Sequence, residues 1–212
     1  MKILDINDIQ FPDVKIIKFG FFTDHRGYFT EPFRKNEFIQ NVDVGSIAGK
    51  EILQINESVS KPDVMRGLHF QWSPYMGKLL RTLKGHMVDM FLDIRLNSPT
   101  YGYIGMYDMP CHDSEEFSEW IWVPPGFAHG NYFLETTKIE YLCTGEYSPD
   151  CEAAISPLSN DLDWSLCDKE CKKRFDFIVQ NSLIISDKDK NGLTLSDWSN
   201  DDRSMNFVYG NC

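Results

Sequence analysis

The chain contains the stretch Arg66-Gly67-Leu68-His69-Phe70-Gln71 and, further on, Pro124-Pro125-Gly126-Phe127-Ala128-His129-Gly130. Each stretch places one histidine beside glycine within a run of residues typical of a β-strand. Histidine gains and loses a proton near neutral pH, and glycine lets a ligand approach the backbone closely. The two stretches therefore predict strands that line a cavity in which protons are transferred.

Short strand-like runs dominate the sequence around these two stretches. Strands are predicted at 53–59, 120–123 and 139–143, and a hairpin is predicted from 78–83, Lys84-Gly85 and 86–94. Helical signals are confined to 36–41 and 167–175. Many short strands separated by Gly, Pro, Asn and Asp are typical of an all-β sandwich or jelly-roll barrel. We expect one domain over 1–212, with its core at about 16–155 and a C-terminal extension at about 156–212.

The strand expected at 86–94 has two chemically different faces. Val88, Met90 and Leu92 alternate with Asp89 and Phe91, and the same alternation continues to Asp93 and Ile94. A face with carboxylates indicates either a polar cavity or contact with solvent, and the pattern by itself favours contact with solvent.

Composition narrows the possible functions. The 212 residues are 42% hydrophobic and 14% aromatic, which is typical of a globular protein, and the net charge of −11 argues against nucleic-acid binding. The start of the chain does not resemble a secretory signal, and no apolar run is long enough to predict a membrane span. The six cysteines form no Cys-x-x-Cys pair, so we expect reduced thiols and a cytoplasmic location.

Two cations accompany the first histidine. Arg66 lies three residues before His69, and Lys78 opens the next expected strand. Two cations beside a histidine favour an anion site and an uncharged imidazole that can act as a base. Such a base needs a carboxylate to orient it. The residues leave four candidates open for this carboxylate, namely Asp89, Asp93, Asp187 and Asp189.

A metal site is an alternative interpretation of the two histidines. The stretch that ends at His129 resembles the second motif of metal-binding cupins, but the position two after His69 is Gln71 rather than a second histidine. We therefore expect no metal, although a metal-dependent cupin enzyme and a non-catalytic sugar-nucleotide binding cupin stay open as alternatives.

Ordered motifs along nearly the whole chain resemble one family of enzymes. They are Asp24-His25-Arg26-Gly27-Tyr28-Phe29-Thr30-Glu31, Gln54-Ile55-Asn56-Glu57-Ser58, the stretches 66–71, 98–102 and 123–130, Tyr141 to Pro149, and Ser186-Asp187-Lys188-Asp189. Together they resemble the dTDP-4-dehydrorhamnose 3,5-epimerases, nucleotide-sugar epimerases of the cupin superfamily. The resemblance implies a double-stranded β-helix and epimerisation at C3, C5 or both of a nucleotide-linked 4-keto-6-deoxy sugar, without a cofactor.

The resemblance also implies roles for individual residues. His69 matches the general base, Asp189 its carboxylate, Tyr141 the general acid and Lys78 the lysine near the developing enolate. Tyr147 is a second nearby tyrosine that ranks below Tyr141 for the acid role. Substrate-contacting or supporting positions are matched by Arg26, Phe29, Glu31, Gln54, Asn56, Arg66, His129, Glu152 and Lys188. The segment 26–31 is contributed across a homodimer interface in the family, so a shared site is implied.

The chain departs from the family pattern between its barrel motifs and Asp189. Ser165 stands where the family often has proline, and the stretch 165–181 is longer and more charged than the pattern predicts.

Overall fold

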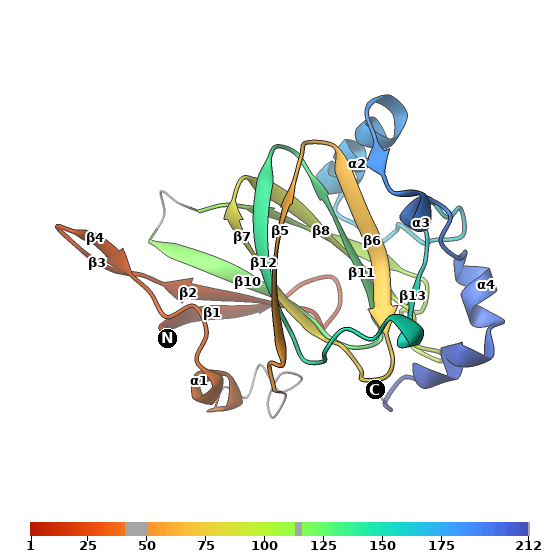
Figure 1. Ribbon diagram of the computed structural model, residues 1–212, viewed down its shortest axis with the longest axis horizontal. Coiled ribbons are helices and arrows are strands. Elements are labelled where there is room, and N and C mark those ends of the chain that lie inside the picture. Colours follow the sequence, from red (N-terminus) through yellow and green to blue (C-terminus); the bar gives the residue numbers. More distant parts are fainter. Residues whose placement is uncertain (41–50, 113–115, 212) are drawn as a thin grey trace.

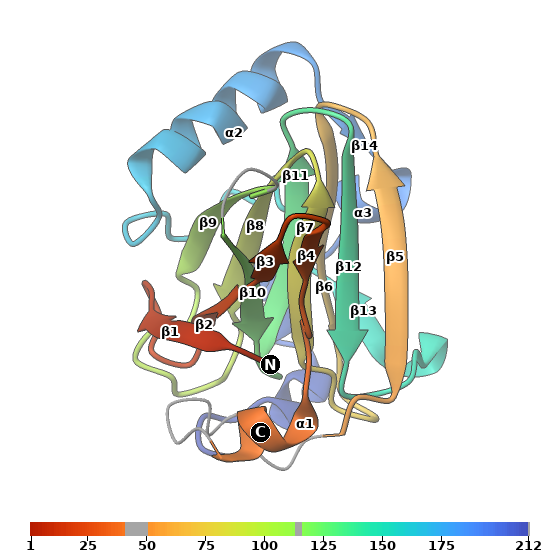
Figure 2. The ribbon, with the colours of Figure 1, turned by 90° about the vertical axis from the view of Figure 1, so that its left-hand side faces the viewer.

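Two β-sheets face each other in the computed structural model, which describes residues 1–40, 51–112 and 116–211. One sheet has the strand order β1-β2-β10-β7-β12-β5 and the other the order β13-β6-β11-β8-β9, as Figure 1 and Figure 2 show from two directions. A short strand, β14, joins β6 in parallel. Non-consecutive neighbours in both sheets give the crossed connections of a jelly roll.

The elements are mostly short strands. The first sheet consists of β1 (Ile3–Asp8), β2 (Lys15–Gly20), β10 (Phe117–Val123), β7 (Lys78–Lys84), β12 (Thr137–Cys143) and β5 (Gln54–Ser60). The second consists of β13 (Glu152–Ala154), β6 (Val64–Gln71), β11 (Phe127–Phe133), β8 (His86–Asp93) and β9 (Ile104–Pro110), with β14 (Ile184–Ile185) beside β6. A separate hairpin pairs β3 (Phe22–Asp24) with β4 (Gly27–Phe29). The helices are α1 (Lys35–Gln40), α2 (Lys169–Asn181), α3 (Asp187–Lys190), α4 (Leu195–Ser199) and the 3-10 turns η2 (Pro149–Cys151) and η3 (Asp202–Asn206). The expectation of an all-β jelly roll with a few short flanking helices is confirmed.

The hairpin predicted at 78–94 is wrong. β7 pairs with β10 and β12 in the first sheet, whereas β8 pairs with β11 and β9 in the second. The chain crosses between the sheets at Gly85, which has a φ of +86° and where a Cβ atom would lie 2.6 Å from the Thr136 carbonyl oxygen. A tight glycine turn between two strand-like runs is typical of a hairpin. Such a turn also fits a connection between two facing sheets, so the local sequence does not distinguish a hairpin from a crossing to the other sheet.

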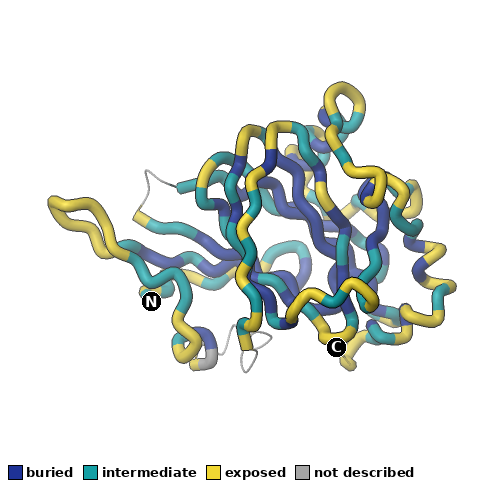
Figure 3. The backbone as a smooth tube through the Cα atoms, in the orientation of Figure 1, coloured by how far each residue is buried: buried dark blue, intermediate teal, exposed yellow. Residues whose placement is uncertain are grey.

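Apolar side chains form three layers around the two sheets, and the strands between them are largely buried (Figure 3). The layer between the sheets includes Phe11, Phe91 and Phe127, whose rings meet edge to face. β8 is buried on both faces, because its aliphatic face lies under the C-terminal segment. Its carboxylate face points between the sheets, so the favoured expectation of a solvent-exposed face is wrong: Asp89 and Asp93 are both fully buried, and Asp89 contacts a cavity-lining histidine.

The C-terminal segment covers the outer face of the second sheet. α2 begins two residues later than the predicted helix and ends six residues beyond it, because the Asp168 side chain caps its first turn by accepting from the Glu170 and Cys171 amides at 3.0 and 2.9 Å. The Tyr132 hydroxyl donates to the Cys171 carbonyl at 2.7 Å and so fixes the helix to β11. Further along, Phe207 is fully buried in the same layer.

The predicted helix at 36–41 is α1, one residue earlier at its start, and position 41 lies outside the described residues. Within those residues, no helix is long and apolar enough to cross a membrane.

Candidate active site

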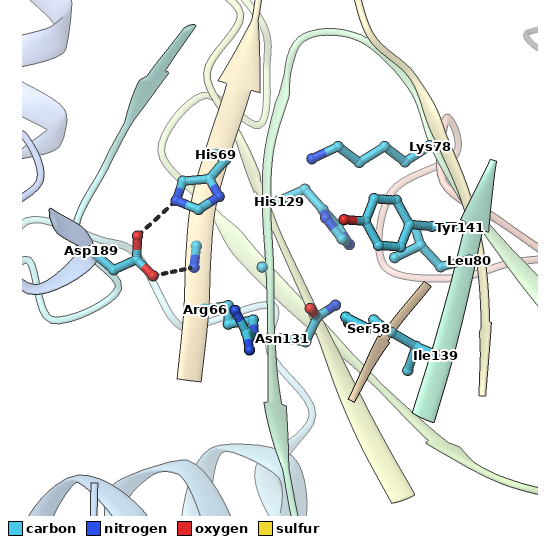
Figure 4. A pocket seen from close by; sticks show the side chains of 12 residues that line it. Ser58, Arg66, His69, Lys78, Leu80, His129, Asn131, Ile139, Tyr141 and Asp189 are labelled. Carbon is cyan, nitrogen blue, oxygen red and sulfur yellow. Dashed lines mark hydrogen bonds and ion pairs between the residues drawn. The ribbon is translucent and has the colours of Figure 1, made fainter. Parts of the chain in front are cut away.

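Two adjoining cavities lie between the facing sheets. The first, of 210 Å³, is lined by Ser58, Arg66, Gly67, His69, Lys78, Leu80, His129, Gly130, Asn131, Ile139, Tyr141 and Asp189 (Figure 4). The second, of 280 Å³, is lined by Gln54, Asn56, His69, Phe70, Gln71, Met76, Lys78, Tyr141, Cys143, Tyr147 and Glu152. Both cavities share His69, Lys78 and Tyr141, so one extended ligand that fills both would pass these three side chains.

His69 enters the cavity from β6 and contacts a carboxylate. Its Nε2 lies 2.7 Å from Asp189 Oδ1, and the Asp189 side chain is buried. Burial alone would raise the pKa of Asp189, but His69 and the Gly67 amide lower it below its ordinary value. An ionised Asp189 accepts a hydrogen bond from His69 Nε2, so the other ring nitrogen, Nδ1, is left to accept a proton.

The strand that carries His69 also determines where Asp189 lies. β14 runs parallel to β6, with Ile185 opposite Met65, and this pairing places the following turn beside His69. Ser186 then begins α3, where its Oγ accepts a hydrogen bond from the Asp189 amide at 3.1 Å. The helix α2 inserted before this turn does not separate Asp189 from His69.

His129 forms a second contact between an imidazole and a carboxylate. It is the Cα partner of His69 in the pairing of β11 with β6, and its Nε2 lies 2.9 Å from Asp89 Oδ2. Asn131 Nδ2 donates to the same carboxylate oxygen at 3.1 Å. Burial lowers the pKa of His129, and the nearby Lys78 lowers it further, while Asp89 opposes the shift. His129 is therefore uncharged at neutral pH.

The remaining two carboxylates that the sequence left open lie elsewhere. Asp93 is buried and binds Arg95, with 2.7 Å between Asp93 Oδ2 and Arg95 Nη2. Asp187 is exposed at the start of α3.

Glycine allows the two histidine strands to approach each other. A Cβ on Gly130 would lie 2.3 Å from the Arg66 carbonyl oxygen, and a Cβ on Gly67 would lie 2.5 Å from the Gly130 Cα. Both glycines also line the first cavity. Their motif therefore serves strand packing in addition to the ligand access that the sequence predicts.

Tyr141 faces His69 from the opposite sheet. It lies on β12, and Figure 4 shows its hydroxyl pointing into the space between β12 and the strand that carries His69. Burial raises the pKa of Tyr141, and Cys143 raises it further, whereas Arg66 opposes the shift. The phenol keeps its proton at neutral pH and can donate it.

Lys78 lies on β7 beside Tyr141 and points into the same space (Figure 4). Burial lowers its pKa, and three nearby groups, Cys143, Asp89 and Glu152, oppose that shift. Burial therefore disfavours the ammonium form of Lys78, and the carboxylates of Asp89 and Glu152 favour it.

Three of the nine residues predicted to contact or support a substrate, Gln54, Asn56 and Glu152, line the second cavity. Gln54 Nε2 donates to Asn56 Oδ1 at 2.9 Å, and both side chains line the cavity wall. Glu152 accepts from the Tyr147 hydroxyl at 2.8 Å and from Lys188 Nζ at 2.6 Å. Arg66 stands instead at the first cavity, where its Nε donates to Ser60 Oγ at 3.1 Å.

Arg26, Phe29 and Glu31 line neither of these two cavities. Arg26 and Phe29 belong to the β3–β4 hairpin, which projects from the sheets and is exposed (Figure 1). Glu31 binds the Met1 amino group at 2.5 Å and also Arg34. Within one chain, the structure does not bring these three residues to the histidines.

Several lining residues received no role from the sequence, among them the polar residues Ser58, Asn131 and Cys143. Each of these three lies two residues after a residue that the sequence did single out, namely Asn56, His129 and Tyr141. Side chains two positions apart in a strand share a face, and this period was the available signal.

A metal centre receives no support from the described residues, since no group of three or more His, Cys, Asp and Glu among them could hold an ion. The Nε2 atoms of His69 and His129 are both occupied by carboxylates instead.

Comparison with known proteins identifies the family. A family model described as dTDP-4-dehydrorhamnose 3,5-epimerase matches residues 8–197. The chain belongs to the dTDP-4-dehydrorhamnose 3,5-epimerase family. A Shigella flexneri member is 35% identical over 196 residues, which cover 89% of this chain and 94% of that protein. A Neisseria gonorrhoeae member is 37% identical over 153 residues, but this match covers 72% of the chain and only 44% of that longer relative.

Solved structures of the epimerase family share the fold. The dTDP-6-deoxy-D-glucose-3,5-epimerase RmlC from Legionella pneumophila, crystallised with dTDP-4-keto-L-rhamnose, superposes with a TM-score of 0.75 at 31% identity. The match covers 91% of this chain and 93% of that one. The cupin-type jelly roll expected from the resemblance is thereby confirmed for this epimerase.

Proposed function

We propose that this protein epimerises a nucleotide-linked 4-keto-6-deoxy sugar, converting dTDP-4-dehydro-6-deoxyglucose to dTDP-4-dehydrorhamnose. The observation that carries this proposal is the placement of His69, bound to Asp189 at 2.7 Å, and Tyr141 on opposite walls of one cavity (Figure 4). A base and an acid on opposite sides of a bound ring are what inversion of a carbon requires. Family membership supports the same reaction.

The ketone at C4 makes the reaction accessible to side chains alone. It acidifies the hydrogens on C3 and C5, and the uncharged His69 imidazole removes one of them while Asp189 stabilises the imidazolium that forms. The electrons pass to the ketone oxygen, and the Lys78 ammonium stabilises the resulting enolate. Tyr141 then donates its proton to the opposite face of the carbon, which inverts the centre. No electrons are lost or gained, so no redox cofactor takes part.

We assign the nucleotide to the second cavity, whose lining groups suit it. It adjoins the first at the three shared residues and adds amide groups, an aromatic ring and a carboxylate from Gln54, Asn56, Tyr147 and Glu152. We assign the sugar to the first cavity, where the base and the acid face each other. Arg66 supplies a cation for the diphosphate on a chain of net charge −11. His129 and Lys188 complete the set of substrate-contacting or supporting groups.

The proposal includes a homodimer and a cytoplasmic location. The exposed β3–β4 hairpin carries Arg26 and Phe29, and Phe29 is 64% exposed. We assign this hairpin and Glu31 to the active site of a second copy. The Cys143 thiol on the cavity wall fits a reducing compartment.

The reaction is tested by incubating the protein with dTDP-4-dehydro-6-deoxyglucose in D₂O and following the sugar by NMR. Deuterium at both C3 and C5 supports the full proposal, and deuterium at one carbon restricts it to that centre. No exchange at either carbon, from protein shown by circular dichroism to be folded, would refute it.

A further inference from the structure

Asp89 is a buried carboxylate to which the proposed reaction gives no role. Its side chain has no exposed surface and lies on β8, on the face that points between the sheets. Its two hydrogen-bond partners, His129 and Asn131, both line the cavity, whereas Asp89 itself does not. It can therefore act on a substrate only through other groups.

We propose that Asp89 is a positioning residue for the reaction: it holds the His129 imidazole in one tautomer and places a buried negative charge behind the wall of the cavity that His129 and Lys78 both line. This inference rests on the proposed epimerase activity. The charge of Asp89 would thus act on both His129 and Lys78, which lie on different sheets.

The contacts of Asp89 determine the state of His129. Asn131 can only donate from Nδ2, so Asp89 Oδ2 accepts that bond, and its carboxylate is left to accept from His129 Nε2. His129 must then carry its proton on Nε2. Its other nitrogen, Nδ1, is an acceptor in the uncharged ring, and it can accept from a sugar hydroxyl and so orient the ring.

The surroundings of Lys78 explain why the charge of Asp89 matters. Burial disfavours the ammonium form and lowers its pKa. The titratable groups that act on Lys78 come from four other strands and are Asp89 on β8, Cys143 on β12, Glu152 on β13 and His129 on β11. Glu152 is already bound to Lys188, and Cys143 is a thiol whose pKa is raised by burial. Of these four groups, Asp89 is the carboxylate that is fully buried.

Asp89→Asn removes the charge while keeping the shape of the side chain. His129 Nε2 lies 3.0 and 2.9 Å from the two carboxylate oxygens, so either orientation of an amide places its NH₂ group within reach of Nε2 and removes one of the acceptors that favour the Nε2–H tautomer. We expect kcat to fall by about tenfold or more with little change in KM, because an oriented group and a charged enolate stabiliser are both weakened. We also expect the alkaline limb of the kcat profile to move to lower pH, because Lys78 loses its proton more easily.

A matched control exists on the neighbouring strand. Asp108 also binds a histidine, with 2.7 Å between its Oδ1 and His86 Nε2, but this pair lies outside both cavities. Asp108→Asn should leave the pH profile and kcat unchanged. An Asp89→Asn profile that matches that of Asp108→Asn would overturn the inference.

Two NMR measurements test Asp89 without substrate. In the wild-type protein, ¹⁵N shifts of His129 should report the Nε2–H tautomer at neutral pH, and the opposite tautomer would overturn the inference even if the variant fails to fold. With ¹³C-labelled lysine, Lys78 should titrate at lower pH in folded Asp89→Asn than in the wild type, and equal titration would refute the charge argument. If the wild-type protein shows no exchange in D₂O, the proposed reaction fails, while these two measurements still decide the role of Asp89.

Discussion

His69 and His129 are Cα partners in the antiparallel pairing of β6 with β11, yet their imidazoles contact different carboxylates. Asp189 reaches His69 from the C-terminal segment, and Asp89 reaches His129 from the neighbouring strand β8. Two histidines on adjacent strands are thus given separate chemical environments within one cavity. His69 is partly exposed to the cavity, whereas His129 is 6% exposed. This greater exposure to the cavity agrees with the assignment of proton removal to His69.

Replacing the proposed base should abolish proton exchange and leave binding intact. For His69→Ala we expect deuterium incorporation at C3 and C5 to fall by about 10²- to 10⁴-fold, the usual contribution of a general base. Binding of dTDP, measured by calorimetry, should change little, because Gln54 and Asn56 line the neighbouring cavity. His86→Ala, which removes a histidine outside both cavities, is the control. Exchange at the wild-type rate in His69→Ala would assign the base elsewhere.

Replacing the proposed acid should separate proton removal from inversion. Tyr141→Phe keeps the ring that packs against the core but removes the hydroxyl that donates a proton. We expect washout of a C3 or C5 label to continue, while the inverted product forms at least about tenfold more slowly. Tyr107→Phe, on β9 and outside the two cavities, should behave as the wild type. Wild-type epimerisation by Tyr141→Phe would redirect the search to Tyr147.

The projecting hairpin should act in the partner's active site. His69→Ala and the double variant Arg26→Ala, Phe29→Ala should each be inactive alone. Refolded together in equal amounts, they should recover about a quarter of wild-type activity, because half of the dimers are mixed and each mixed dimer has one complete site. Activity and the dimer fraction are measured on the same samples by enzyme assay and light scattering. A mixture that forms mixed dimers without recovering activity would show that the hairpin serves its own chain.

Stability should depend on pH through the buried pair of Asp93 and Arg95. Burial would raise the pKa of Asp93, but Arg95, Ser98 and Thr100 lower it below its ordinary value. A lowered folded-state pKa gives stability that is present above the unfolded-state pKa and is lost as the pH falls through the folded-state pKa. Asp93→Asn should therefore lower the free energy of unfolding by about 3–5 kcal/mol at pH 7, because it leaves Arg95 without a buried carboxylate.

Urea unfolding of both proteins between pH 7 and pH 3 checks this prediction. The difference between wild type and Asp93→Asn should shrink on the acidic side, as the wild-type carboxylate becomes protonated. A difference that stays constant down to pH 3 would contradict it. Asp187→Asn, at an exposed position, provides the control and should match the wild type throughout.

The sequence by itself determined the strands of the site and the residues on them. The runs around His69, His129 and Tyr141 are strand-forming by composition, and their period of two fixes which neighbours share their face. The same period extends to Asn131 and Cys143, to which no motif match assigned a role. Family motifs added Asp189, which the residues alone left as one of four candidates.

Only the tertiary structure decided which strands and charges meet. The run 78–94 has the pattern of a hairpin, but a glycine turn sends β8 into the facing sheet, and there Asp89 contacts His129 rather than His69. Likewise, Asp189 lies 120 positions after His69 and reaches it through the parallel pairing of β14 with β6. Local sequence sets backbone preference and side-chain direction, whereas contacts between distant segments follow from how the sheets pack together and bury their apolar faces.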